Sequence, residues 1–220
     1  MSIEIEKKNA MREKLLVKLL PVIRKEGVSS LRIERIAKIM DISKATMYKY
    51  FSSKEEIIES IVDLYVSYIT DIGETIVDHN ASYSEHFQKS FEQSLLIAFY
   101  ISNEYLNDLQ TSYPTLYEKI SDAHDKRNEQ ISHISDQYQN EGIFNPINIY
   151  LLHMQDQFLL RKLFDPALLT KMNMTLYEAL LDYYSLTKHQ LIHPEYLNEI
   201  DDNKIHELLK KLVQKFSTTM

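Results

Sequence analysis

The side chains best suited to chemistry lie together on one short predicted helix, over residues 44–50. Lys44 and Lys49 carry positive charge, Thr46 has a hydroxyl group, and Ala45 and Tyr48 stand beside them. A helix this short is unstable alone in water, so the chain must gain another interaction by presenting these residues outward. Ammonium and hydroxyl donors suit phosphate oxygens and base edges. The residue types therefore predict binding to duplex DNA.

Metal binding and catalysis find little support elsewhere in the sequence. The eight histidines all follow residue 78, and no pair has the HExxH spacing of a zinc helix. There is no cysteine, no G-x-S-x-G motif and no glycine-rich phosphate loop. We expect no metal, no cofactor and no enzyme activity, and we expect the histidines to be surface or hydrogen-bonded residues. The full set is His79, His86, His124, His133, His153, His189, His193 and His206.

Two predicted helices and a tight turn position the cluster at residues 44–50. Ile33, Ile36, Ala37 and Met40 recur at intervals of three and four residues, which predicts one buried face of a helix. The turn is Asp41-Ile42-Ser43, where Ser43 is a good N-cap for the next helix. Ser53 with Glu56 predicts a capping box that starts a further helix. Residues 28–59 therefore indicate a helix-turn-helix.

The same stretch resembles the DNA-binding domain of TetR-family (tetracycline-repressor-type) regulators over roughly residues 8–60. The order and spacing are similar to the family pattern of I-A, G-V-S, T-L/F-Y-x-H/Y-F and x-S-K-E-E-L. Asp41 replaces the usual glycine, and Asp tolerates a left-handed turn better than most residues. Leu31-Arg32 replace a common threonine cap, so we expect Ser29 or Ser30 to cap that helix. The matching residues are Ile36-Ala37, Ile42-Ser43, Thr46-Met47-Tyr48, Tyr50-Phe51 and Ser53-Lys54-Glu55-Glu56.

The motif assigns DNA contacts by position. We expect Lys44, Ala45 and Thr46 to face base edges, and Ser43 to lie beside them. We expect phosphate contacts from Tyr48, Lys49, Tyr50 and Lys54, with Arg32 and Arg35 completing the basic surface.

The charge distribution agrees with this assignment. Residues 1–60 carry 13 Lys and Arg against 9 Asp and Glu, whereas residues 61–220 carry 12 against 23. The balance is therefore +4 in the first part and −11 in the second, which makes the net charge of −7. This asymmetry localises phosphate contact to the N-terminal part.

Composition and helix signals predict an all-α chain. Three glycines and five prolines accompany many helix-forming residues. We expect a first helix over 6–25, kinked at Pro21. A long helix then runs from Ser53 to about Ile76. Further helices are predicted at 83–102, 103–112, 114–139, 146–163, 166–172, 175–190 and 203–217, with Pro114, Pro146 and Pro166 at helix starts.

These elements predict a three-helix helix-turn-helix DNA-binding domain over residues 1–52 and a larger helical domain over 53–220. The resemblance implies that the larger domain binds an effector and forms a homodimer. Nowhere does an apolar run reach the length of a membrane span or signal peptide, so we expect no membrane partner and a cytoplasmic protein.

Aromatic side chains mixed with polar ones in the larger domain predict a small-molecule pocket. The candidate lining residues are Phe99, Tyr100, His153, Met154, Gln157 and Phe158. The helices at 146–163 and 175–190 resemble the family's dimerising pair, with a seam of Ile147, Leu151, Met154 and Phe158. The amphipathic helix at 203–217 competes for that role.

The resemblance implies a repressor that a small-molecule effector releases from a palindromic operator. Two other functions stay open at this point: a helical interaction module that keeps the motif without binding DNA, and a helical ligand-binding enzyme. The sequence names neither the effector, the operator nor the regulated genes.

Overall fold

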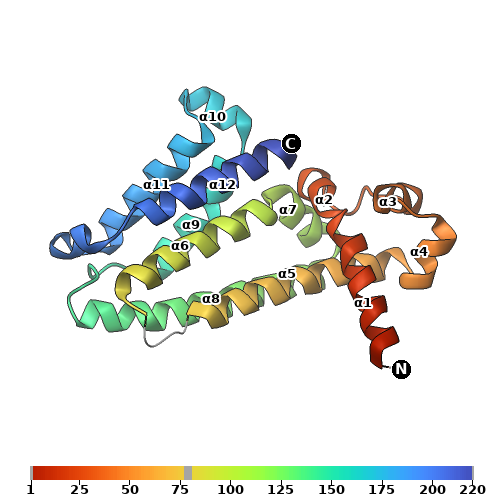
Figure 1. Ribbon diagram of the computed structural model, residues 1–220, viewed down its shortest axis with the longest axis horizontal. Helices are drawn as coiled ribbons and strands as arrows, with labels where there is room; N and C mark the ends of the chain where they lie inside the picture. The colour runs from red at the N-terminus through yellow and green to blue at the C-terminus, as the bar shows by residue number, and fades with distance from the viewer. Residues whose placement is uncertain (1, 77–80, 220) are drawn as a thin grey trace. The chain divides into compact units, whose positions relative to one another are not determined.

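The computed structural model describes residues 2–76 and 81–219, and every regular element within these ranges is a helix (Figure 1). The predicted all-α class is confirmed. The helices are α1 (Ser2–Val17), α2 (Leu20–Glu26), α3 (Ile33–Met40), α4 (Lys44–Tyr50), α5 (Lys54–Ile76), α6 (Tyr83–Tyr100), α7 (Asn103–Ser112), α8 (Pro114–Asn140), α9 (Ile149–Leu163), α10 (Pro166–Met172), α11 (Leu176–Leu191), the 3-10 turn η1 (Pro194–Glu199) and α12 (Asn203–Thr219).

The chain forms two compact units. The first joins Met1–Tyr68 to Tyr100–Ala123, and the second joins Ile69–Phe99 to His124–Met220. Helices α5, α6 and α8 therefore belong partly to each unit. The functional boundary predicted between residues 52 and 53 stays a prediction.

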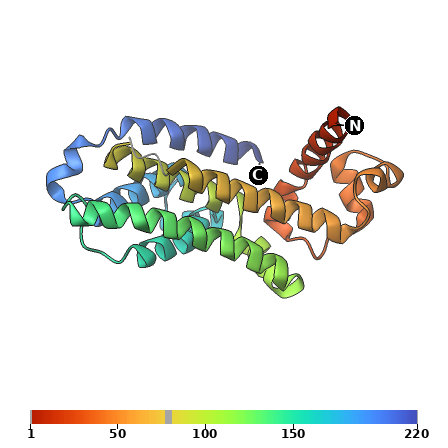
Figure 2. The same cartoon turned by 90° about the horizontal axis from the view of Figure 1, so that it is seen from below.

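The single first helix predicted over 6–25 is wrong. The chain leaves α1 after Val17 and starts α2 at Leu20, so Pro21 lies in the first turn of α2 and not inside a kinked helix (Figure 2). A proline is tolerated there because the first N–H groups of a helix have no intrahelical acceptor. The predicted three-helix motif accordingly contains four helices, α1 to α4.

The helix-turn-helix itself begins and ends as the sequence indicates. Ile36, Ala37 and Met40 of α3 are buried. Asp41 ends α3 in the left-handed conformation, with φ of 60°, and the hydroxyl of Ser43 accepts from Thr46 N–H at 3.0 Å. The tolerance of Asp for this turn and the Ser43 cap are both confirmed.

Two predicted caps differ in the structure. The N-cap of α3 is Arg32, whose side chain makes no capping hydrogen bond, so capping by Ser29 or Ser30 is wrong. At α5, Ser53 Oγ does accept from Glu56 N–H at 3.1 Å. The Glu56 carboxylate, however, accepts from the N–H and hydroxyl of Ser52 and not from Ser53.

Within the first unit, Asp108 of α7 holds the segment between α2 and α3. Its carboxylate accepts from the backbone N–H groups of Val28 at 2.5 Å and Ser29 at 2.8 Å, and from the Ser29 hydroxyl. Gly27 makes the approach possible: its φ is +74°, and a Cβ there would collide with the Asp108 side chain. Burial works to raise the pKa of Asp108, but the bonds from Ser29 and Val28 outweigh it and lower the pKa.

Further contacts join α7 and the start of α8 to the rest of this unit. Ser102 caps α7 by accepting from Tyr105 N–H, and its own hydroxyl donates to the Arg24 carbonyl at 2.6 Å. Helix α8 starts beside α5, where Lys119 Nζ lies 3.2 Å from Glu59 and 3.7 Å from Asp63 (Figure 2). The helix-turn-helix therefore shares one core with segments from far along the sequence.

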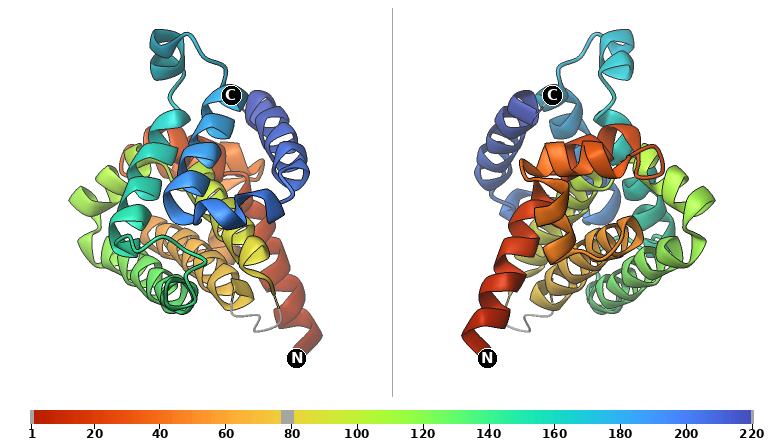
Figure 3. Two further views of the ribbon diagram at one scale, coloured as in Figure 1. Left: turned by 90° about the vertical axis from the view of Figure 1, so that its left-hand side faces the viewer. Right: turned by 90° about the vertical axis from the view of Figure 1, so that its right-hand side faces the viewer.

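The second unit packs α9 against α10 and α11, and α11 against α12 (Figure 3). Phe99, Phe164 and Phe216 form an aromatic cluster with ring centroids 5.3–5.8 Å apart. The predicted helix start at Pro146 is wrong: α9 begins at Ile149, and the Asn148 side chain accepts from Leu151 N–H. The capping box of Thr175 and Glu178 at α11 is confirmed.

We expect Asp108→Ala to destabilise the protein by about 2–3 kcal/mol, because it leaves the N–H of buried Val28 without its acceptor. Asp108→Asn keeps one acceptor oxygen and should lose less. The free energy of unfolding from urea titration measures both. Asn107→Ala, on an exposed neighbour in α7, is the matched control and should be close to neutral. Equal losses in the control and in Asp108→Ala would contradict the assigned role.

Candidate nucleic-acid interface and effector cavity

Helix α4 presents the predicted DNA-contacting side chains to solvent. Only Met47 of this helix is buried, and Phe51 follows it into the core. Lys44, Ala45 and Lys49 are exposed, and the Tyr48 side chain is 49% exposed. The surface expected to face DNA is therefore free within the described chain. The remaining predicted contacts are exposed at Arg32, Arg35 and Ser43, and half-buried at Thr46, Tyr50 and Lys54.

Acidic residues hold two of the predicted basic contacts. Lys44 Nζ lies 2.7 Å from Glu34, and the Arg35 guanidinium lies 2.6 Å from Glu26. The hydrogen bond from Lys44 lowers the pKa of Glu34, and the bond from Arg35 lowers that of Glu26. Such exposed pairs contribute little to stability, but a phosphate must replace the carboxylate before either cation can contact DNA.

Two other predicted contacts have different surroundings. Lys54 Nζ donates to the Ser29 carbonyl at 2.8 Å, so it also supports the segment before α3. Lys49 has no hydrogen-bond or ion-pair partner among residues 2–76 and 81–219. The Lys49 ammonium is thus a predicted phosphate contact that no carboxylate of the described chain holds.

Arg12 of α1 fixes the end of α4, a role that the sequence analysis missed. Its guanidinium donates to the Tyr50 carbonyl at 2.6 Å and to Glu56 at 2.8 Å, and it lies 4.6 Å from the centroid of the Phe51 ring. Carbonyls at a helix C-terminus lack intrahelical donors, so a cation there is stabilising. Hydrogen bonds from Ser52, then the bond from Arg12, lower the pKa of Glu56 to about 2.

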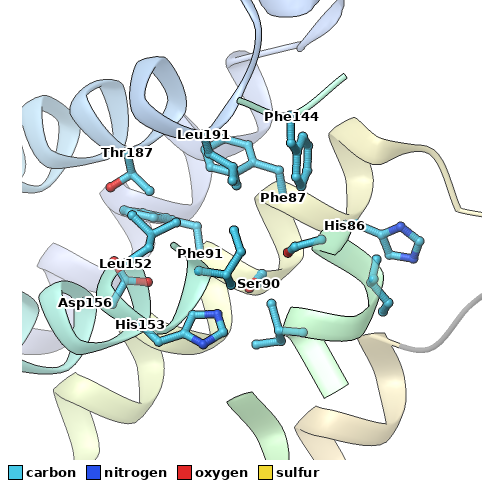
Figure 4. Close-up of a pocket in the computed structure, with 14 residues that line it drawn as sticks. His86, Phe87, Ser90, Phe91, Phe144, Leu152, His153, Asp156, Thr187 and Leu191 are labelled. Carbon is cyan, nitrogen blue, oxygen red and sulfur yellow. The ribbon is translucent and has the colours of Figure 1, made fainter. Parts of the chain in front are cut away.

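The second unit contains a cavity of about 30 Å³ among α6, α8, α9 and α11. Phe87, Phe144 and Leu191 lie together at one end of it, while His153 and Asp156 of α9 lie at the other (Figure 4). Most of its lining is apolar. This lining, mostly apolar with a few polar groups, has the composition of a small-molecule pocket.

A second cavity of about 10 Å³ shares His153 and Asp156 with the first, so the two are neighbours. Its other polar lining comes from Ser94 of α6, from α8 and from the following residues of α9. Arg127, only 4% exposed, donates to the Ser94 hydroxyl at 3.1 Å and the Ser90 carbonyl at 3.2 Å. The other polar lining residues are His124, Asn128, Gln157 and Arg161.

Two histidines in these cavities have buried ring nitrogens without a hydrogen-bond partner in the described chain: Nε2 of His124 and Nδ1 of His153. Burial, then Arg161 and Arg127, lowers the pKa of His124 to about 3. Burial, then Arg127, lowers the pKa of His153 to about 4. Both rings are therefore neutral at neutral pH.

The expectation that every histidine is a surface or hydrogen-bonded residue is wrong for His124 and His153. A buried polar atom without a partner carries a free-energy cost, which a ligand can remove. His86 does fit the expectation, because its Nδ1 lies 2.7 Å from the Tyr138 hydroxyl. His79 lies outside the described residues.

The predicted effector residues are not all in one place. His153 lines both cavities and Gln157 lines the smaller one. Phe99 is in the aromatic cluster with Phe164 and Phe216, and the Tyr100 carbonyl, in the first unit, accepts from Tyr65. Met154 and Phe158 are on the exposed face of α9. These last four do not line either cavity.

Sequence reasoning missed most of the lining, including Arg127 and Asp156. A signal existed in α8, where polar residues occupy the helix face that carries the buried Ile120 and Ile131. His124 and Arg127 follow Ile120 at four and seven residues, a spacing that places them on the same face. Polar residues on a core-facing stripe indicate a polar cavity.

The described chain holds no cluster of three metal-binding side chains, and none of its helices is long and apolar enough to cross a membrane. Its fold and exposed α4 define a helix-turn-helix protein with a separate helical unit that contains a cavity.

Comparison with known proteins supports the assignment as a helix-turn-helix protein. A model of bacterial regulatory proteins of the tetR family matches residues 16–61. The biofilm operon icaADBC HTH-type negative transcriptional regulator IcaR of Staphylococcus epidermidis is 22% identical over 190 residues, which are 86% of this chain and 78% of the relative.

Solved structures share the fold. A protein of Saccharomonospora viridis in complex with choline has a TM-score of 0.67 at 19% identity, covering 84% of this chain and 99% of that one. The ketosteroid transcriptional regulator KstR2 of Mycobacterium tuberculosis has a TM-score of 0.63 at 17% identity, covering 83% and 95%. Residues 16–61 thus match the tetR family of bacterial regulatory proteins, and the chain has the fold of solved transcriptional regulators.

We expect Lys49→Ala to weaken binding to all DNA sequences and to lower the slope of log affinity against log salt by about one. Lys44→Ala should instead change which sequences are preferred, because Lys44 is the predicted base contact. Fluorescence anisotropy over a salt series measures both. Lys171→Ala, which removes an exposed charge from α10, is the control and should bind as the parent does. An unchanged salt slope in Lys49→Ala would refute the phosphate contact.

Proposed function

We propose that this regulator is a repressor that binds a palindromic operator as a homodimer and is released by a small-molecule effector, without catalysis. The cavity of the second unit, with its unpaired polar atoms, carries the proposal. The relative IcaR is a negative regulator, and the Saccharomonospora viridis neighbour was solved with a small molecule, choline. An interaction module without DNA binding is not favoured, because the family match covers the DNA-binding helices.

The dimer proposal is supported by exposed apolar side chains on α9, which packs against α11. Leu151 is 61% exposed, Phe158 is 64% exposed and Leu186 of α11 is 49% exposed. Apolar groups this exposed on neighbouring helices suggest an interface. A second copy is the occupant we propose, because a two-fold pair presents two α4 helices to the two halves of a palindrome.

Helix α12, the competing dimer element, has its apolar stripe occupied. Ile205, Leu209, Leu212 and Phe216 are all buried within the chain's own second unit. This burial favours α9 and α11 as the dimer helices.

We expect Phe158→Glu to give a folded monomer, because a carboxylate at the centre of an apolar interface would be desolvated without a partner. Sedimentation velocity measures the mass, and circular dichroism checks that the helices remain. Met172→Glu places the same charge on an exposed apolar residue of α10, outside the proposed interface residues of α9 and α11, and should stay dimeric. A dimeric Phe158→Glu protein with the parent's association constant would exclude this interface.

Effector and operator should oppose each other's binding. A ligand shifts an equilibrium only by its differential affinity for two states, and typical couplings of about 1–3 kcal/mol correspond to roughly 5–150-fold. The operator is first selected from a random DNA pool. Compounds that raise the protein's Tm are then titrated into the protein by calorimetry, in the presence and in the absence of the operator. We expect the active compounds to bind at least about 5-fold more weakly when the operator is present; equal affinities would rule out release by that mechanism.

A further inference from the structure

We infer that the effector is a small organic anion, a carboxylate on an apolar body, whose acidic group binds between Arg127 and Arg161 beside His124. The inference rests on the proposed function of the second unit as the effector-binding unit. It specifies the charge of the ligand and the residues that recognise it.

The acidic group is placed by the guanidinium donors that line the smaller cavity. Arg127 is held by Ser90 and Ser94 of α6, so its guanidinium is fixed against the cavity wall. Arg161 also lines this cavity. It is half-buried and donates to the Gln157 carbonyl of its own helix at 3.1 Å, a bond that a ligand carboxylate can replace. A planar guanidinium matches a carboxylate through two parallel hydrogen bonds.

The two unpaired histidine nitrogens add further donors. His124 is 7% exposed and His153 is 5% exposed, and both line the cavity. A neutral imidazole can carry its proton on either nitrogen, so each unpaired nitrogen can donate to a carboxylate oxygen. An anion there would supply the hydrogen bonds that these buried atoms lack.

The charges around the cavity also favour an anion. Two guanidinium groups, which stay protonated, face a single carboxylate, Asp156. Asp156 is already engaged, because it accepts from the Tyr183 hydroxyl at 2.6 Å. Burial raises its pKa to about 6, although Tyr183 and Arg127 act in the other direction. The cluster thus has an excess of positive charge.

The apolar body of the ligand is placed in the larger cavity. That cavity meets the smaller one at His153 and Asp156, and beyond them its wall is made by Phe87, Phe91 and Leu152. At about 30 and 10 Å³ the two cavities hold only a few water molecules. Binding must therefore move the lining side chains apart, which gives a ligand two arrangements to discriminate between.

Two substitutions with opposite expected effects test the charge of the ligand. Arg127→Gln removes the fixed cation and should weaken anion binding at least about 10-fold. Asp156→Asn keeps the acceptor for Tyr183 but removes the opposing negative charge, so it should bind the anion as tightly as the parent or more tightly. A cationic ligand would reverse both effects, and a neutral ligand would respond to neither charge.

The probes are two sets of three compounds, and within each set the apolar body is the same while the polar group is anionic, neutral or cationic. The aromatic set is phenylbutanoate, phenylbutanamide and phenylbutylamine. The aliphatic set is octanoate, octanamide and octylamine. Each is titrated by calorimetry into the full-length parent and variants at constant ionic strength. We expect binding of the carboxylates, at least about 10-fold weaker binding of the amides and amines, and the two opposite responses above. Arg161→Gln and the charge-preserving Arg127→Lys serve if Arg127→Gln does not fold: the first should lose affinity and the second should keep part of it.

Preference for the amines, or carboxylate binding unchanged in Arg127→Gln and Arg161→Gln, would overturn the inference. Failure of all six probes to bind the parent would also overturn it, because the set spans an aromatic and an aliphatic body. These outcomes leave the proposed function standing, since release from the operator by some other compound is measured separately. If carboxylates bind as expected but operator affinity does not respond, the repressor proposal fails and the anion site remains.

Discussion

Most of the DNA contacts predicted for this chain lie on a helix that cannot persist alone. Helix α4 has seven residues, fewer than a helix needs to be stable in water. It is held instead from three sides: Ser43 caps its start, Met47 anchors its buried face, and Arg12 bonds the carbonyl of Tyr50 at its end. The orientation of α4 is thus set by the core of the first unit and not by local propensity.

That core extends well beyond the sequence motif. Asp108 of α7, about 80 residues along the chain from Val28 and Ser29, holds the segment that leads into α3. The same segment receives Lys54 at the Ser29 carbonyl. A shift of α7 would therefore change the support of the helix-turn-helix directly, because hydrogen bonds to a charged carboxylate are costly to break. Helices α6 and α8, which flank α7 in sequence, continue into the second unit.

Local signals predicted the helices well and the long-range contacts poorly. Caps at Ser43 and Thr175 act within three residues, and the Asp41 turn depends on one residue's backbone, so the sequence contains all that is needed. The partners of Asp108 and Arg12 lie far away in sequence, and no periodicity indicates them. The apolar stripe of Leu15, Leu19 and Ile23 continues through the break before Pro21, and all three side chains are buried. The hydrophobic pattern therefore does not indicate where α1 ends and α2 begins.

The candidate ligand site was only half predictable for a related reason. Aromatic residues are poor markers of this site, because Phe99 packs into an aromatic cluster and Phe158 faces solvent. The more informative residues are polar ones that the helix period places on a buried face. Burying a polar group without a hydrogen-bond partner destabilises the folded state, so its presence there suggests a role other than stability.

Arg127 with His124 illustrates the point. Replacing them by apolar residues of similar volume would remove the cost of burying a cation and an unpaired ring nitrogen. A fold that needed only a stable core would gain from that change. Their presence on the core-facing stripe of α8 therefore favours a role in recognition, in which a ligand supplies the hydrogen bond that the buried His124 nitrogen lacks.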